Sequence, residues 1–186
     1  MKITLNTPVT AEDLKDLKAG DDVYITGYVY TARDAAHARL VELLEQGKEL
    51  PVDLEGAIIY YVGPAPAKPG QPLGSAGPTT SYRMDSYAPA LMDQGLRGMI
   101  GKGRRDQNVK DKIVETGSVY FAAIGGAAAL IAKAVKSAEI VAYEDLGAEA
   151  IRKLYVEDLP VTVINDAHGN DLYEEGREEY LKWAEK

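Results

Sequence analysis

The chain has 186 residues and a formal net charge of −8, with 29 acidic against 21 basic side chains. One domain over residues 1–186 is expected at this length, and the acidic balance disfavours a general nucleic-acid binder, which needs a basic face. The absence of cysteine excludes disulfides, a thiol nucleophile and thiolate ligands for zinc or an iron–sulfur cluster.

The apolar segments do not indicate a membrane span, and the local charges do not indicate binding to a polymeric anion. The longest alanine-rich segment, Ala122–Ala134, contains two glycines and falls short of the ~20 apolar residues that a membrane span requires. We therefore expect a soluble, cytoplasmic protein. Between Arg83 and Lys110 six cations stand against three anions, and a local cationic site on an acidic body suits a small anionic ligand.

The first expected elements are a short strand, Ile3–Leu5, and a helix capped by Thr10. The segment Asp22–Tyr30 is β-branched and aromatic, which is typical of a strand buried on most of its surface. Apolar residues then recur at helical spacing from Arg33 to about Gln46, so a helix is expected to begin directly at the strand end.

Arg33 is predicted in the first turn of that helix, where a cation opposes the helix dipole. This mismatch favours a ligand-binding role, and the alternative is a surface salt bridge to Asp34 or another neighbour. His37 is four residues further on and shares the face of Arg33. It is expected to orient another group rather than to react.

The stretch Gly77–Asp85 combines a turn, three successive hydroxyls and an arginine, and it follows an expected strand, Ala57–Val62, and a proline-rich loop. Any of the three hydroxyl residues can cap a helix suggested by Met84–Met92. The N–H groups at such a helix start, together with the planar fork of Arg83, would hold a carboxylate or phosphate. The alternative is an ordinary capped helix with a surface arginine.

The segment Gly101-Lys102-Gly103 at the next strand end resembles a phosphate loop only superficially. Leu96 occupies the position where such a loop needs glycine, and Gly103 occupies the position where it needs a magnesium-binding Ser or Thr. A nucleoside triphosphatase is therefore excluded. A lysine between two glycines still allows close backbone approach of a ligand to a mobile ammonium. Arg104 and Arg105 are expected to be solvated or to face a partner.

In the rest of the chain, expected helices and strands alternate in the same way. The expected helices are Asn108–Thr116, a helix from Gly125-Gly126 to Val135, and an amphipathic helix over Leu172–Ala184 docked by Trp183, and the expected strands are Ser118–Ala122, Glu139–Tyr143, Leu154–Val156 and Pro160–Ile164. A hairpin is expected over Asp166–Asp171, with His168 as a turn residue. The alternation predicts an α/β fold with a mixed sheet flanked by helices.

The candidate site residues all fall where strands lead into helices or loops, which is where open α/β sheets bind ligands: Arg33, Thr79, Thr80, Arg83 and Lys102. Their cations suit a dicarboxylate. Five motifs in order then resemble the β subunit of class I (iron–sulfur) fumarate hydratase and the related L-tartrate dehydratase β subunit, over roughly residues 20–171: Ala32–His37, Gly77–Asp85, Gly101–Gly103, Ile124–Ala128 and Val156–Pro160.

The resemblance implies one half of a hydro-lyase that interconverts fumarate and L-malate, with a swivelling β/β/α fold. A separate α subunit would bind a [4Fe–4S] cluster through three cysteines, this chain would bind no metal, and a two-α, two-β heterotetramer is the family's assembly. By the same resemblance Arg33, Arg83 and Lys102 would bind substrate carboxylates.

In the same family pattern Thr80 would contact the substrate and Thr79 would be the candidate catalytic base. A threonine hydroxyl needs an activating neighbour, which is expected to be a carboxylate on the α subunit. Supporting positions around the site would be Asp34, His37 and Asp85. Tyr82 departs from the smaller residue common in the family, so it either narrows the pocket or points outward.

Three other interpretations remain open. The first is a hydro-lyase whose substrate is L-tartrate instead of malate. The second is a non-catalytic module that binds a small dicarboxylate, and the third is a structural subunit of an assembly.

Overall fold

The computed structural model describes residues 2–123 and 128–185. The strands are β1 (Ile3–Asn6), β2 (Asp22–Thr31), β3 (Ile58–Tyr60), β4 (Gly98–Gly101), β5 (Val119–Ala123), β6 (Val135–Ala142) and β7 (Ile151–Asn165). The helices are α1 (Ala11–Leu14), α2 (Asp34–Glu45), α3 (Ala88–Asp93), α4 (Gln107–Thr116), α5 (Ala128–Ala134) and α6 (Leu172–Ala184), with two 3-10 helices, η1 (Ser81–Met84) and η2 (Glu144–Glu149).

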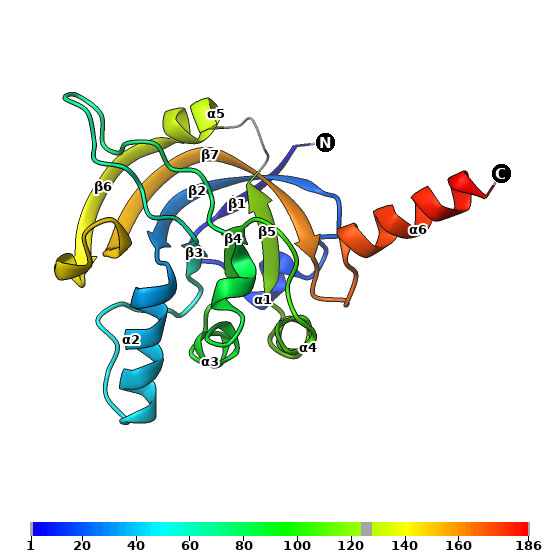
Figure 1. The fold of residues 1–186 in the computed structure, drawn as a ribbon, viewed down its shortest axis with the longest axis horizontal. Coiled ribbons are helices and arrows are strands. Elements are labelled where there is room, and N and C mark those ends of the chain that lie inside the picture. The colour runs from blue at the N-terminus through cyan, green and yellow to red at the C-terminus, as the bar shows by residue number, and fades with distance from the viewer. Residues whose placement is uncertain (1, 124–127, 186) are drawn as a thin grey trace.

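The strands form one mixed sheet that closes on itself. Strands β2, β3, β4 and β5 are parallel neighbours, and β7 runs antiparallel to both β2 and β5. The pairing of β7 with β2 therefore joins the two ends of a five-strand barrel (Figure 1). Strand β1 extends the sheet on β2, and β6 extends it on β7. The predicted mixed α/β fold is confirmed, and its closure into a barrel is an additional finding.

Two hydrophobic cores lie on the two faces of this barrel wall. Along β3 and the two residues after it, Ile58, Tyr60 and Val62 belong to the core inside the barrel, whereas Ile59 and Tyr61 belong to the core under the helices. All five are almost completely buried. Parallel strands covered on both faces read as continuous apolar runs, which explains why this segment lacks polar alternation.

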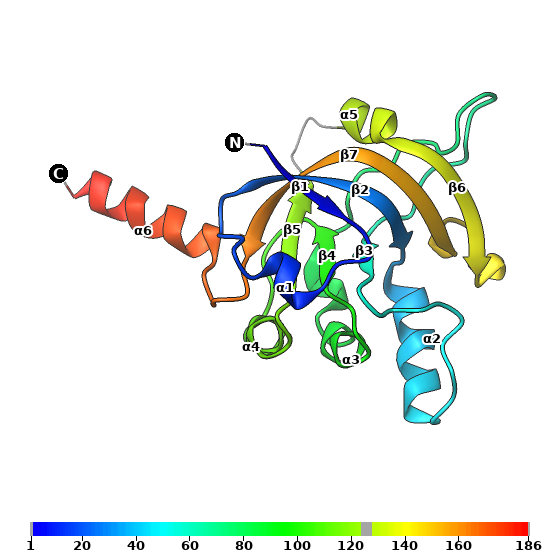
Figure 2. The same ribbon diagram turned by 180° about the vertical axis from the view of Figure 1, so that it is seen from behind.

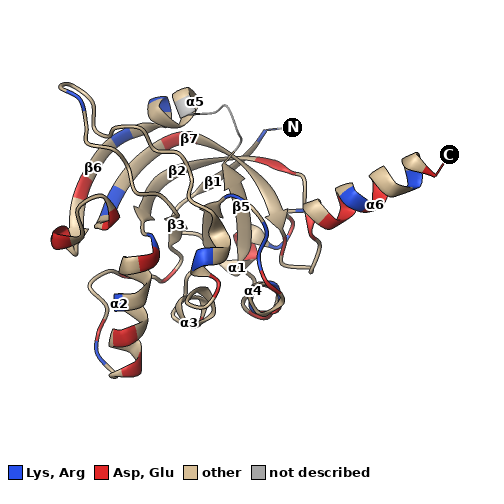
Figure 3. Cartoon of the chain, viewed as in Figure 1, with Lys and Arg blue, Asp and Glu red and all other residues tan. Residues whose placement is uncertain are grey.

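Helices α2, α3 and α4 cover one side of the strands, and α5 lies on the opposite side, as the two views show (Figures 1 and 2). Helix α6 projects away from the body. Only its first residues, Leu172 and Tyr173, pack against the core. Trp183 is 72% exposed, so the prediction that it docks the helix is wrong. Both acidic and basic residues occur along the projecting helix (Figure 3).

Strand β7 is one element of 15 residues, where two separate strands were expected. Pro160, where the second strand was expected to begin, lies in the stretch between the pairings with β6, which end at Val156, and those with β5, which begin at Val161. A register shift against β2 occurs in the same stretch, at Asp158 with φ 52°. Pro160 itself comes after this bulge and is in register with Tyr24 of β2.

The region before β6 also differs from expectation. Val135 begins β6, whereas it was predicted to end a helix, and that helix is α5 in the structure. The glycine pair predicted to begin it, Gly125-Gly126, lies outside the described residues. In the described part of the chain no helix is long and apolar enough to span a membrane.

Candidate functional site at the carboxyl ends of the parallel strands

The carboxyl ends of the parallel strands bring the predicted site residues to one edge of the barrel. Arg33 follows β2, the loop that ends at Thr79 and Thr80 follows β3, and Lys102 follows β4. Because parallel strands end at a common edge, these residues gather although up to 69 positions separate them in the sequence. A cavity of about 630 Å³ beside the end of α2 lies elsewhere, between Leu44 and Gln94.

Arg33 is the N-cap of α2, one position before the helical turn in which it was predicted. Its Nε atom lies 3.8 Å from Asp34 Oδ1 and 3.8 Å from Glu149 Oε1, and its side chain is 26% exposed. The backbone carbonyl of Arg33 accepts a hydrogen bond from Nδ1 of His37 at 2.8 Å. The arginine is therefore held on a rigid helix start while part of its side chain reaches solvent.

Asp34 links the two candidate arginines. Its Oδ2 atom lies 3.0 Å from Nε of Arg83, while its Oδ1 atom faces Nε of Arg33. The predicted alternative for Arg33, a salt bridge to Asp34, is thus present in the structure. It does not remove the candidate role, because Arg83 remains 48% exposed and one carboxylate is shared between two guanidinium groups.

His37 is completely buried in the core under the helices. Burial lowers the pKa of its imidazole from 6.5 to about 4, so the ring is neutral near pH 7. Its ring packs edge-on against Tyr61, with 5.3 Å between ring centroids. With Nδ1 bonded to the Arg33 carbonyl, His37 has the geometry of a group that fixes the start of α2, and this role remains a prediction.

The hydroxyl stretch does not begin the long helix that the sequence suggested. It forms η1 over Ser81–Met84, and α3 begins only at Ala88. The backbone N–H of Thr79 donates to Tyr61, and Thr80 forms an isolated parallel bridge with Lys102. Thr80 makes no side-chain capping bond, so the predicted capping role is wrong for it. Because η1 is so short, the expected helix-start anion cradle does not form.

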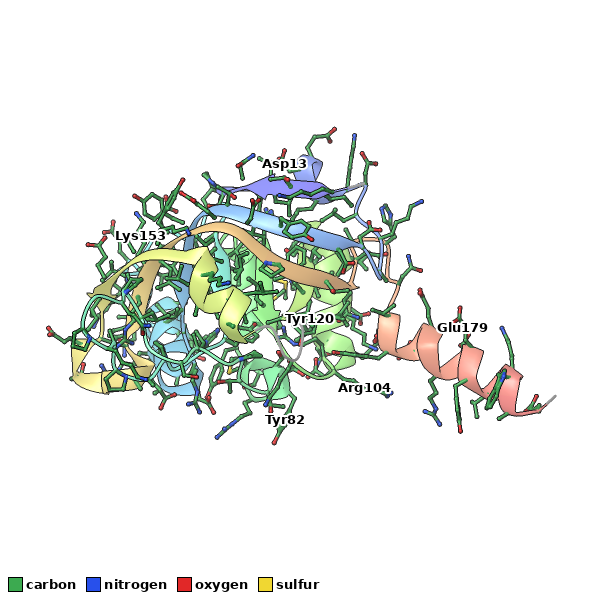
Figure 4. The ribbon with its side chains drawn as sticks, turned by 90° about the horizontal axis from the view of Figure 1, so that it is seen from above. Asp13, Tyr82, Arg104, Tyr120, Lys153 and Glu179 are labelled. Atoms are coloured by element: carbon green, nitrogen blue, oxygen red, sulfur yellow. The ribbon has the colours of Figure 1, made fainter. Side chains whose placement is uncertain are left out.

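A buried hydrogen-bond chain fixes the hydroxyl stretch to the lysine loop. Ser81 Oγ lies 2.8 Å from the hydroxyl of Tyr120, which donates to the carbonyl of Gly103 at 2.8 Å. Burial raises the pKa of the Tyr120 hydroxyl, which keeps its proton for this bond. Tyr120 lies inside the body, whereas Tyr82 and Arg104 lie at its surface (Figure 4). Tyr82, with 66% of its surface exposed, therefore points outward and does not narrow the site.

Asp85 and Arg105 form a buried ion pair beneath the same loop. Nε of Arg105 donates to Asp85 Oδ1 at 2.6 Å, and the backbone N–H of Asp106 donates to Oδ2 at 2.8 Å. The guanidinium also donates to the Tyr61 hydroxyl and lies over the ring of Tyr120. The prediction that Arg105 is solvated is wrong, since only 4% of it is exposed. Its neighbour Arg104 is exposed, as predicted.

Comparison with known proteins matches a family model described as the fumarase C-terminus to residues 1–176. The chain belongs to the fumarase C-terminus family. The resemblance inferred from the five motifs is thereby confirmed.

Several members of the fumarase C-terminus family are similar to almost the whole chain. It is 42% identical over 179 residues to the anaerobic class I fumarate hydratase of Escherichia coli K12, covering 94% of this chain and 33% of that protein. It is 37% identical over 177 residues to fumarate hydratase 2 of Leishmania major, covering 93% of this chain and 31% of that protein.

A relative of a different length is similar to the same extent. A Methanocaldococcus jannaschii protein designated a candidate L(+)-tartrate dehydratase subunit beta is 40% identical over 181 residues, covering 94% of this chain and 92% of that protein. The chain thus spans about a third of these fumarate hydratases and nearly all of the beta subunit.

The structure adds residues to the site that sequence reasoning missed. Glu149 reaches Arg33 from η2, a segment in which no site residue was predicted. Tyr61 and Tyr120 were considered only as strand residues, although both contact Arg105. The tyrosines could have been recognised because each places a hydroxyl group within an otherwise apolar strand. No local sequence pattern indicates a role for Glu149.

Proposed function

We propose that this chain is the β subunit of an iron–sulfur hydro-lyase that interconverts fumarate and L-malate. The observation that carries the proposal is the fumarase C-terminus match over residues 1–176, which includes every cation and hydroxyl of the candidate site. On this proposal residues 1–186 act as one unit.

Arg33, Arg83 and Lys102 would bind the two carboxylates of the substrate. Two guanidinium forks suit bidentate carboxylate binding, and a lysine adds a mobile charge. Lys102 is exposed, and among the described residues its ammonium makes no ion pair. The backbone bridge from Thr80 to Lys102 supports a role for both in one site.

The reaction requires a proton to leave C3 of malate and hydroxide to leave C2, so that a C2–C3 double bond forms. Negative charge develops on the carboxylate attached to C3 as the C–H bond breaks, and fixed cations around that carboxylate lower the barrier. Thr79 would take the C3 proton and Thr80 would contact the substrate. Thr79 Oγ1 forms no hydrogen bond with a described residue, so the activating carboxylate would belong to a partner.

The donor set of this chain does not fit an iron–sulfur cluster. The sequence has no cysteine, and no cluster of three or more potential metal ligands occurs among the described side chains. We therefore assign the [4Fe–4S] cluster to an α subunit with its own cysteines, in a two-α, two-β heterotetramer. The similarity to a protein designated a beta subunit supports a separate partner.

The partly exposed arginines suggest how the two subunits would cooperate. On this proposal the barrel is a swivelling β/β/α domain that closes over the dicarboxylate against the α subunit. The open position of Arg33 and Arg83 at the strand ends supports such a closure.

L-tartrate is the second candidate substrate, favoured by the M. jannaschii relative with its matching length. Tartrate is a dicarboxylate with one more hydroxyl than malate, so the same cations would bind it. A dicarboxylate-binding module without catalysis and a structural subunit of an assembly are the remaining alternatives.

The test is anaerobic co-expression of the full chain with its α partner, cluster reconstitution, and absorbance assays of L-malate and L-tartrate in parallel. Malate turnover that needs both chains would support the fumarate hydratase proposal, and turnover of tartrate alone would replace its substrate. No turnover of either substrate by a cluster-loaded complex would contradict it.

The variant Arg83→Ala separates catalysis from assembly. Loss of activity in a complex that still assembles is expected for a substrate-binding residue. Full activity in that variant would favour a structural subunit.

A further inference from the structure

The guanidinium of Arg33 is bounded by the protein on two of its three edges. Along the edge formed by Cδ and Nη1, a Cβ atom at Gly63 would lie 3.0 Å from Cδ and 3.2 Å from Nη1, so the arginine side chain packs closely against this glycine. Along the opposite edge, Nε faces the carboxylates of Asp34 and Glu149 at 3.8 Å each. The remaining edge is the terminal fork of Nη1 and Nη2, which forms no hydrogen bond with a described residue.

Glu149 is delivered to this place by a segment that is fastened at two points. Asp145 in η2 accepts two hydrogen bonds from Arg39 of α2, at 2.9 and 2.6 Å. Arg152 of β7 donates to the carbonyls of Gly147 and Ala148, both at 3.2 Å. The helix that begins at Arg33 and the segment that carries Glu149 are therefore tied to each other independently of Arg33.

Three charged atoms at this point are buried and have no hydrogen-bond partner among the described residues: Arg33 Nε, Asp34 Oδ1 and Glu149 Oε1. Opposite charges 3.8 Å apart attract, and they are about 1 Å beyond the length of a charge-assisted hydrogen bond. A buried donor or acceptor without a partner raises the free energy of the folded protein. A shorter separation between Arg33 Nε and either carboxylate would therefore lower that free energy.

We propose that Glu149 is a positioning residue that holds the Nε edge of Arg33 and thereby directs its terminal fork toward a carboxylate of the ligand. The inference rests on the proposed function, because it makes Arg33 a carboxylate-binding group. Glu149 itself does not touch the substrate.

When Glu149 loses its charge, an effect of charge alone and an effect on the orientation of Arg33 change the affinity for an anionic ligand in opposite directions. Removing one negative charge beside Arg33 strengthens attraction of an anion if charge alone matters. Removing the group that orients Arg33 weakens binding, because the fork then samples directions that do not fit a carboxylate. The direction of the change therefore tests the inference.

The first experiment uses the full chain with ¹⁵N-labelled arginine and follows the Arg33 Nε–H resonance by NMR, assigned from its loss in Arg33→Lys. In Glu149→Gln this proton is expected to exchange with water at least about tenfold faster, which corresponds to weaker protection. The matched control is Glu144→Gln, which removes the same charge from an exposed position of the same segment. Equal exchange in the two variants would overturn the inference.

The second experiment measures kinetics of the same variants in the complex with the α subunit. Glu149→Gln is expected to raise KM for malate and Ki for succinate about tenfold with little change in kcat, as for loss of uniform binding. Glu144→Gln should match the wild type. An unchanged or lower KM in Glu149→Gln would overturn the inference, whereas a cluster-loaded wild-type complex without turnover would contradict the proposed function and leave the NMR result to decide on Glu149.

Discussion

Asp85 and Arg105 form an ion pair inside the protein, with 2.6 Å between Oδ1 and Nε and almost no exposure of either side chain. Asp85 is five positions after Thr80 and Arg105 is three positions after Lys102, so the pair joins the two segments that carry these candidate residues, and both carboxylate oxygens of Asp85 accept hydrogen bonds. The candidate site is thus built on a buried charge pair.

Asp85→Asn should destabilise the fold strongly. The variant leaves the guanidinium of Arg105 buried without a counter-charge, which costs about 3–5 kcal/mol in comparable cases. Urea unfolding followed by circular dichroism measures the change. The control Glu115→Gln removes an exposed carboxylate that pairs with Lys112, and it should change stability little. A loss for Asp85→Asn no larger than that of the control would contradict the prediction.

Gly101→Ala should be damaging although alanine is small. A Cβ atom at this position would lie 1.9 Å from Ser81 Oγ and 2.9 Å from Tyr61 Cδ2, so Ser81 must move. We expect about 1–3 kcal/mol loss of unfolding free energy from this overpacking. The control is Gly176→Ala in α6, where no atom lies within 4 Å and alanine favours the helix. Thermal unfolding of both variants measures the two changes in stability. Equal stability would contradict the prediction, because the residues around Gly101 would then accommodate the Cβ atom without cost.

Lys102→Gln should weaken catalysis in the complex with the α subunit. Loss of a charged contact to a substrate carboxylate is expected to lower kcat/KM by about 10- to 100-fold. The neighbouring exposed cation Arg104 provides a matched control, because Arg104→Gln removes the same charge two positions away. Steady-state assays with malate distinguish the two. If both variants lose activity equally, general attraction of the anion explains the effect and Lys102 has no specific role.

The buried imidazole of His37 should make stability depend on pH. Its pKa is about 4 in the folded protein against 6.5 in the unfolded chain, so the unfolded chain binds the proton first as the pH falls. The free energy of unfolding therefore decreases between about pH 6.5 and pH 4, by on the order of 3 kcal/mol in total.

His37→Asn keeps a donor near the Arg33 carbonyl but cannot titrate. Urea unfolding between pH 7 and pH 5 should show a shallower slope for this variant than for the wild type. Carboxyl groups whose pKa is lowered by hydrogen bonds, such as Asp166 and Asp171, act at lower pH and do not disturb this window. The same slope in both proteins would assign the pH dependence to another group.

The places of the candidate residues in the fold could be predicted because they depend on local chemistry at strand ends. The strand Asp22–Thr31 leads into α2 at Arg33, and the short strand β4 ends directly before Lys102, as the sequence indicated. These junctions depend on residue types within a few positions. The parallel order of the strands then places them at one edge.

The errors arise where distant segments decide the environment. Arg105 reads as one of several surface cations, and only the fold brings Asp85 and two tyrosines around it. Trp183 reads as an anchor, yet α6 leaves the body before it can pack. The closing pair of β2 and β7 joins residues such as Asp22 and Thr162, 140 positions apart, and no local pattern records such a contact.

The same closing strand has a consequence for how the chain folds during synthesis. Strands β2 and β5 each present an open edge until β7 is made, because β7 is the partner of both. Contacts over such long sequence separations form slowly, and open edges invite association with other chains. The barrel of the nascent protein therefore stays incomplete until residues 151–165 have been made, and the addition of β7 covers both open edges at once.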